Sequence, residues 1–244
     1  MDKYVVSAFV EQPKAQGIDF GEKIEINGVK IIPQNEGKIK FSVELEGSDD
    51  QQVLDDARRR IESIVYALTL EFGTPFKLGE AWIESKVSVS GKQKKIMVCE
   101  RVALKYSVEV KIRPGAEHLA RISKLATKLE HISSERRNLL SRIFKWFYRA
   151  LIDEDPVDRF IQLYIALEVI GEFKYPQETF TQRVKKVLTD FCDSDIAKEV
   201  VGLRGALLHS GTRDKEVMTY IPHMANAILS CAKEIVNIRN KARI

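Results

Sequence analysis

Polar and apolar residues alternate along much of the first half of the chain. The alternation is strict over residues 38–46, which predicts a β-strand with one buried face. Shortly before it, Asn27 and Gly28 separate two apolar runs. This dipeptide predicts a hairpin with a type I′ turn, because both central residues of that turn need a positive φ. Two further strands are expected over residues 76–90 and 94–112, with a turn between them.

A different pattern interrupts these strands. Over residues 49–72 the apolar positions recur every three or four residues, which predicts an amphipathic helix that ends at Gly73. Strands therefore precede and follow a helix, an order typical of an α+β domain. Pro114 and Gly115 punctuate the chain after the last strand. The pattern predicts an α+β domain over residues 1–115.

The rest of the chain, residues 116–244, carries helical periods only and is expected to form an all-α bundle. Asp155 followed by Pro156 is a sharp helix start, because the carboxylate caps free N–H groups and proline lacks the N–H that the first turn leaves unpaired. Asp193 is expected to cap a later helix in the same way, and Gly211 to end that helix. Helices are expected near residues 116–130, 134–152, 156–171, 177–191, 194–209 and 215–240.

Charge distinguishes the two parts. The chain of 244 residues carries a formal net charge of +4. Residues 1–118 hold 18 Lys/Arg and 19 Asp/Glu, a net −1, whereas residues 119–244 hold 21 and 16, a net +5. The excess in the helical part is mild, and it is compatible with a polyanionic partner.

The sequence also bears on the compartment and on cofactors. It has no run of 18 apolar residues and no secretory signal pattern at its start, so we expect a cytoplasmic protein without a membrane span. Cys99, Cys192 and Cys231 are far apart and are interpreted as buried free thiols. Motifs for dinucleotides, P-loop phosphates, zinc proteases and serine hydrolases are absent, and the four histidines lack zinc-finger spacing. We therefore expect no cofactor and no metal.

Candidate chemistry lies in Arg204 and His209. They are about 140° apart around an ideal helix, but a long arginine and a histidine in the last turn can converge on one phosphate. Arginine presents a fixed fork of donors to a phosphodiester, and histidine moves protons near neutral pH. Together they predict metal-independent RNA cleavage by the ribose 2′-hydroxyl. The alternative is a capping histidine beside a surface arginine, since this spacing arises by chance in many helices.

Glu168 is a candidate supporting residue. It follows Tyr164 by one helical turn and Phe160 by two, so it lies on or beside an apolar face. A carboxylate there needs a partner, and Arg204 is the candidate, in a pair that would orient the guanidinium. The alternative places Glu168 at the edge of the apolar face, in water.

These residues resemble a HEPN domain, most closely its Apea-like branch. The resemblance rests on residues 155–168 (DPVDRFIQLYIALE) and, after an intervening helix, on residues 203–211 (LRGALLHSG). It covers roughly residues 135–240. It implies a four- or five-helix domain, and many such domains are metal-independent endoribonucleases of prokaryotic toxin–antitoxin or antiviral systems.

The resemblance further implies a homodimer through the helical domain, with Arg204 and His209 of both protomers facing one composite site. RNA would be the ligand, and an antitoxin or another regulator a possible protein partner. The position after the arginine is often polar in active members, whereas here it is Gly205. A non-catalytic HEPN-like dimerisation or regulatory module is therefore the alternative function, and the role of residues 1–115 stays open.

Overall fold

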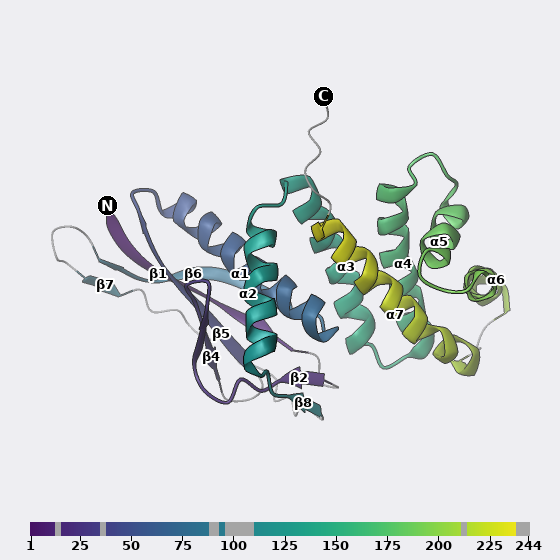
Figure 1. Cartoon of the computed structure of the whole chain (residues 1–244), viewed down its shortest axis with the longest axis horizontal. Helices are drawn as coiled ribbons and strands as arrows, with labels where there is room; N and C mark the ends of the chain where they lie inside the picture. Colours follow the sequence, from purple (N-terminus) through teal and green to yellow (C-terminus); the bar gives the residue numbers. More distant parts are fainter. Residues whose placement is uncertain (13–15, 35–37, 88–92, 96–109, 211–213, 238–244) are drawn as a thin grey trace. The chain divides into compact units, whose positions relative to one another are not determined.

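The computed structural model describes residues 1–12, 16–34, 38–87, 93–95, 110–210 and 214–237 (Figure 1). The chain divides into two compact units, Met1–His131 and Ile132–Ile244. The first contains the sheet and two helices, and the second is entirely helical where it is described. An α+β unit followed by a helical unit is the architecture that the sequence predicted.

The N-terminal unit is built on a six-stranded antiparallel sheet with strand order β3-β4-β5-β1-β6-β7. A separate parallel pair joins two short strands, β2 and β8. The strands are β1 (Asp2–Glu11), β2 (Gln16–Ile18), β3 (Ile24–Ile26), β4 (Val29–Pro33), β5 (Lys38–Gly47), β6 (Lys77–Val87), β7 (Gln93–Lys95) and β8 (Val110–Ile112). Most of the strand predicted over residues 94–112 lies outside the described residues.

Strand β1 is central in the sheet, yet the pattern of polar and apolar residues did not predict a strand there. Tyr4, Val6 and Val10 are buried on one face, while Val5 and Phe9 are partly exposed on the other. Because apolar residues occupy both faces, the run lacks the polar–apolar alternation that reveals a strand with one buried face.

The predicted hairpin turn is confirmed. Asn27 and Gly28 join β3 to β4 with φ values of 50° and 76°, the two positive values that a type I′ turn needs. Asn27 also connects the turn to the helix over residues 116–130. Its Nδ2 donates to the carbonyl of Ser123 at 3.1 Å, and its Oδ1 accepts from the Ser123 hydroxyl at 2.6 Å.

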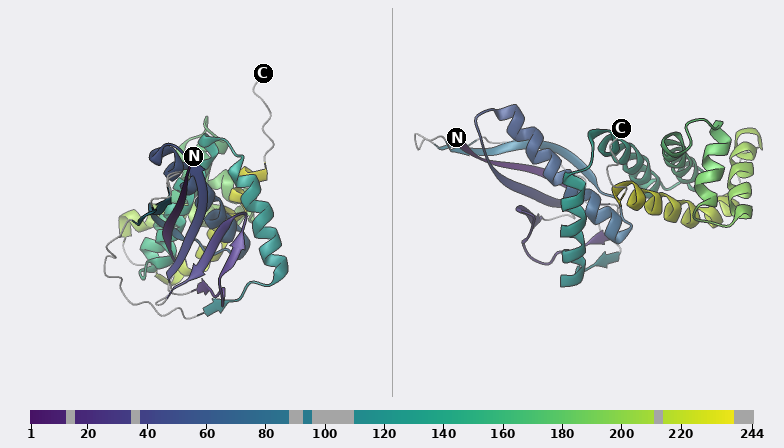
Figure 2. Two further views of the ribbon diagram at one scale, coloured as in Figure 1. Left: turned by 90° about the vertical axis from the view of Figure 1, so that its left-hand side faces the viewer. Right: turned by 45° about the horizontal axis from the view of Figure 1, so that its top comes forward.

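Helix α1 (Asp50–Phe72) lies across one face of the sheet, and α2 (Ala116–Glu130) packs against α1 (Figure 2). Asp49 caps α1 by accepting a 2.7 Å bond from an N–H of its first turn, and Gly73 ends it with φ 69°, as predicted. Since α2 packs on α1, the chain divides after His131, later than the expected boundary between residues 115 and 116.

The helical unit has α3 and α4 as an antiparallel pair, with α7 and α5 packed on α4 and α6 packed on α5 (Figure 1). Its helices are α3 (Ser134–Ile152), α4 (Pro156–Lys174), α5 (Phe180–Thr189), α6 (Ser194–Ser210) and α7 (Asp214–Asn237). Both predicted caps are confirmed. Asp155 accepts from the N–H groups of Val157 and Asp158, and Asp193 accepts from that of Asp195. Gly211, the predicted helix end, lies outside the described residues.

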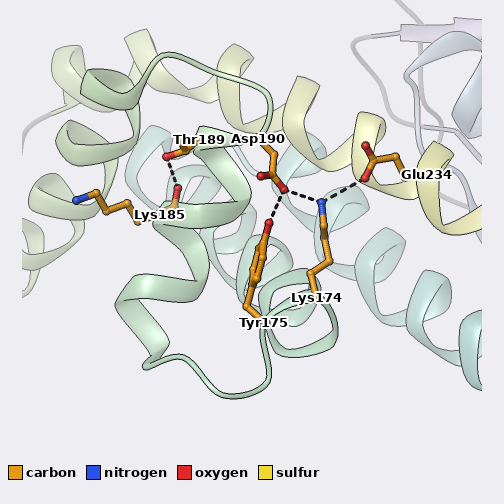
Figure 3. A network of polar contacts seen from close by, with 6 residues as sticks. All are labelled: Lys174, Tyr175, Lys185, Thr189, Asp190 and Glu234. Atoms are coloured by element: carbon orange, nitrogen blue, oxygen red, sulfur yellow. Dashed lines mark hydrogen bonds and ion pairs between the residues drawn. The ribbon is translucent and has the colours of Figure 1, made fainter.

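A polar network ties three of these helices together. Lys174, at the end of α4, donates to Asp190 at 2.7 Å and to Glu234 of α7 at 3.2 Å (Figure 3). Tyr175 donates to the same Asp190 oxygen at 2.6 Å, just beyond the end of α5. Burial opposes ionisation of Asp190, but the two donors prevail and hold its pKa below the ordinary value. The network fixes the ends of α4 and α5 against α7.

The structure can be compared with two further expectations, one about membrane spans and one about the cysteines. Among the described helices, none is both long and apolar enough to span a membrane. Cys231 is buried as expected, whereas Cys192 is partly exposed because it lies in the turn between α5 and α6. Cys99 lies outside the described residues.

Candidate functional site

The candidate site residues all belong to the helical unit. Glu168 lies on α4, and Arg204 and His209 lie on α6. The backbone of His209 is in the last turn of that helix, whereas its imidazole lies outside the part of the structure that is described. The structure therefore defines the surroundings of Arg204 and Glu168 directly.

Two aromatic rings hold the Arg204 guanidinium. Its Cζ atom is 5.3 Å from the ring centroid of Tyr164 on α4 and 5.3 Å from that of Phe180, the first residue of α5. A guanidinium over an aromatic face gains roughly 0.5–1 kcal/mol at an exposed site and more where water is excluded. Contacts with aromatic rings do not occupy the N–H donors of the guanidinium as hydrogen bonds to oxygen would, so these donors remain available to a ligand.

The expected ion pair between Glu168 and Arg204 is not formed among the described contacts. No Glu168 oxygen lies within 4.0 Å of an Arg204 nitrogen. The two groups still interact over a longer distance, since the arginine charge lowers the pKa of Glu168. The rings of Tyr164 and Phe180, rather than the carboxylate, orient the guanidinium.

Glu168 is partly buried, and this alters its ionisation. Burial raises the pKa of the carboxyl to about 7, although the Arg204 charge acts in the opposite direction. The carboxyl is thus close to half protonated at neutral pH. It is neither the ion-paired residue nor the residue in water that the sequence left as alternatives.

Tyr164 contributes a buried hydroxyl to the same cluster. The residue is only 2% exposed, and its hydroxyl has no hydrogen-bond partner among the described residues. Burial raises the pKa of Tyr164 to about 12, and the nearby Glu168 raises it further while Arg204 lowers it. A buried donor without a partner costs about 1–3 kcal/mol. Two other side-chain atoms of α4, Arg159 Nε and Gln162 Oε1, are also buried without a partner among the described residues.

Tyr164 and Phe180 were not predicted as site residues. The sequence indicated that Tyr164 is buried, which is confirmed, but it gave no sign that Arg204 would lie over its ring. Phe180 is 46% exposed although it is a large apolar residue. The signal that marks Phe180 is its exposure as an aromatic residue at a helix start, and this is visible only once the start of α5 is known.

The arrangement supplies an oriented cation beside a carboxyl that titrates near neutrality. An arginine whose charge is not paired with a carboxylate attracts an oxyanion, and its planar donors match two oxygens of a phosphate. A histidine five residues later, at the end of the same helix, supplies a group that can exchange a proton. Over the described residues, no group of three or more His, Cys, Asp or Glu is placed to hold a metal ion.

Comparison with protein-family models, with curated proteins and with solved structures finds no match for this chain. The functional interpretation therefore depends on the residues and contacts of the helical unit.

Proposed function

We propose that the helical unit is a metal-independent endoribonuclease of HEPN type. In this proposal Arg204 binds the phosphate that is cleaved, and His209 transfers a proton. The observation that carries it is the Arg204 guanidinium, which two aromatic rings orient while no described carboxylate pairs with it. The net charge of +5 over residues 119–244 supports a polyanionic ligand.

The reaction needs one base and one acid. The ribose 2′-hydroxyl loses its proton to the base and attacks the adjacent phosphorus, while the bond to the 5′-oxygen breaks and the acid protonates that oxygen. The products are a 2′,3′-cyclic phosphate and a 5′-hydroxyl. Arg204 offsets the charge that develops on the phosphate oxygens. A helix C-terminus attracts positive charge, so we assign the acid role to the histidine at this position, His209.

One chain supplies one His209, so a second copy would provide the base. We propose a two-fold homodimer through the helical unit, in which both copies of Arg204 and His209 face one RNA. Two-fold dimers are the commonest soluble assembly. We place this protein in the cytoplasm, with the N-terminal α+β unit recognising a target or regulating cleavage. A prokaryotic toxin–antitoxin or antiviral system is the setting that the HEPN resemblance suggests, with an antitoxin or regulator as possible partner.

A second candidate is a non-catalytic dimerisation module, and Gly205 is the observation that favours it. Glycine has neither the donor nor the acceptor that a polar side chain would place beside Arg204. In this case Arg204 and His209 only stabilise the end of α6, and the unit binds a partner without cleaving RNA.

Total RNA incubated with the protein in EDTA separates the two candidates. The nuclease proposal expects cleavage by the wild type and its loss in His209→Ala. His223→Ala is a matched control, since it removes a histidine from α7 of the same unit and should leave cleavage intact. RNA that stays intact with pure, folded wild type, or cleavage that persists in His209→Ala, would favour the dimerisation module.

A further inference from the structure

We infer that Arg204, Tyr164 and Phe180 form a binding site for one phosphate group of RNA, and that protonation of Glu168 controls its affinity. The inference concerns the same residues as the proposed nuclease, and it rests on that function only for naming RNA as the source of the phosphate. It adds a ligand subsite with a defined proton switch to the proposed cleavage chemistry.

The first argument is that no described carboxylate pairs with Arg204. Several cations of the helical unit have carboxylate partners, such as Arg142 with Glu172 at 3.3 Å and Lys174 with Asp190 at 2.7 Å, while Arg159 donates to a backbone carbonyl. Arg204 contacts two rings instead. An oriented cation without a counter-charge is suited to an external anion, because binding does not first require an internal ion pair to break.

The second argument is the Tyr164 hydroxyl. It is a buried donor that no described group accepts, and it belongs to the ring over which Arg204 lies. A buried polar group without a partner calls for an explanation, and a ligand oxygen is one. A phosphate drawn to Arg204 brings the acceptor that this hydroxyl lacks. Phe180, whose ring also contacts the guanidinium, is 46% exposed and adds an apolar surface beside the proposed anion site.

The third argument is the position of Glu168, one turn beyond Tyr164 on α4. The charge that acts on it comes from Arg204 of α6, and the neighbouring titratable group on its own helix is Tyr164. Arg142 of α3 pairs with Glu172, a turn further along α4. Phe180 of α5 carries no charge, while Arg183 of α5, which lies against α4 at Gly171, donates to two backbone carbonyls. Glu234 of α7 pairs with Lys174. Glu168 is therefore the internal anion that competes with a phosphate for Arg204.

The direction of the switch follows from the ionisation of Glu168. Its pKa of about 7 means that the neutral form dominates at pH 6 and the carboxylate at pH 8. A neutral carboxyl leaves Arg204 free for phosphate, whereas a carboxylate attracts the guanidinium and repels the ligand. Since apparent affinity scales with the fraction of competent protein, about nine-tenths at pH 6 and about one-tenth at pH 8, phosphate binding should weaken about tenfold over this range.

Calorimetric titration at constant ionic strength tests the inference. One probe is a 2′-O-methyl RNA oligonucleotide, which cannot be cleaved by its own 2′-oxygen and keeps its charge between about pH 6 and about pH 8. The other is inorganic sulfate, which stands for a free oxyanion and also keeps its charge. We expect wild type to bind the oligonucleotide about tenfold more weakly at the higher pH. Arg204→Ala should lose most of this binding at both pH values. Sulfate that competes with the oligonucleotide in wild type supports a phosphate subsite, and sulfate without any effect contradicts it.

Glu168→Gln is the decisive variant, because glutamine keeps the shape of the neutral acid and cannot ionise. It should bind equally well at both pH values, with the affinity that wild type shows at the lower one. Glu172→Gln is the matched control: it removes a carboxylate one turn away on the same helix and should keep the wild-type pH dependence. If Glu168→Gln still weakens tenfold, another group is the switch and the inference is wrong.

These outcomes are separable from those of the nuclease proposal. Pure protein that binds the oligonucleotide with the predicted switch but cleaves no RNA overturns only the nuclease. Cleavage that depends on His209, combined with pH-independent binding, overturns only the switch. Circular dichroism of each variant shows whether it is folded before binding is compared.

Discussion

The Arg204 guanidinium lies over the ring of Tyr164, with 5.3 Å between Cζ and the ring centroid, while the hydroxyl of that same tyrosine is buried without a described partner. The ring holds the cation that α6 contributes, and the hydroxyl remains unused within the fold. Cores usually pair their buried polar groups, so this relationship supports the proposed site for an external acceptor.

Replacement of Tyr164 by phenylalanine should separate stability from binding. It removes only the hydroxyl and keeps the ring beneath Arg204, so the free energy of unfolding should stay the same or rise by about 1 kcal/mol. Affinity for the RNA oligonucleotide should fall by several-fold, roughly the loss of one hydrogen bond. Denaturant unfolding and calorimetry measure the two quantities.

Tyr175→Phe is the matched control for this change. Its hydroxyl donates to Asp190 at 2.6 Å, so its removal should lower the free energy of unfolding by about 1 kcal/mol and leave RNA affinity unchanged. A Tyr164→Phe protein that is destabilised like Tyr175→Phe, with unaltered affinity, would show that the Tyr164 hydroxyl is an ordinary part of the core.

The raised pKa of Glu168 predicts a pH-dependent stability. Since the pKa is about 7 in the folded protein and close to the ordinary 4.5 in the unfolded chain, the folded state binds the proton more tightly. The stability that protonation contributes is complete below about pH 4.5 and is lost as the pH rises to about 7. Glu168→Gln should therefore exceed wild type in unfolding free energy at about pH 8, by on the order of 1 kcal/mol once solvent at this partly exposed carboxyl is considered.

Urea unfolding at about pH 5 and at about pH 8 measures this difference. Glu172→Gln again serves as control, because it removes a carboxylate that pairs with Arg142 and whose side chain is 58% exposed. It should show no gain at the higher pH. An equal stability of Glu168→Gln and wild type at both pH values would mean that Glu168 titrates as an ordinary surface group.

Gly205 gives a prediction about gain of function. A Cβ atom there would meet no described atom within 4 Å, so a larger side chain can be placed without a clash with the described residues. Gly205→Asn should add a polar group beside Arg204 and increase RNA cleavage, and it should also stabilise α6 because glycine is unfavourable inside a helix. Gly202→Asn, a turn earlier and equally open, should stabilise the helix without raising cleavage. Equal cleavage by both variants would separate Gly205 from the chemistry.

The proposed homodimer predicts a mass of two chains by light scattering of the full-length protein at micromolar concentration. Mixing Arg204→Ala with His209→Ala subunits should then restore part of the cleavage that each lacks, if one intact residue of each kind suffices in a shared site. A single-chain mass at the concentrations that support cleavage would contradict the composite site.

Local signals in the sequence predicted local structure well. Asn27 and Gly28 determine their turn through allowed φ values, and Asp155 with Pro156 determines the start of α4 through capping, so neither depends on distant residues. Strand β1 could not be predicted in the same way, since its apolar residues occupy both faces and its role is set by its partners β5 and β6.

The arrangement of the candidate site could not be predicted without the tertiary structure. The sequence identified Arg204, His209 and Glu168, but it suggested an ion pair where the structure has an arginine held by rings. This arrangement arises where residues of α4, α5 and α6 come together. The spacing of residues within any one of these helices does not predict it. The unpaired Tyr164 hydroxyl is likewise a property of the packed core.

The rate of RNA cleavage in EDTA by Arg204→Ala tests the central claim most directly. Its matched control is Arg142→Ala, which removes an arginine of the same unit whose side chain is 59% exposed and pairs with Glu172. The account predicts a fall of roughly 100-fold or more for Arg204→Ala, with little change for Arg142→Ala and 2′,3′-cyclic phosphate ends on the wild-type products. Cleavage by folded Arg204→Ala at the wild-type rate would contradict it.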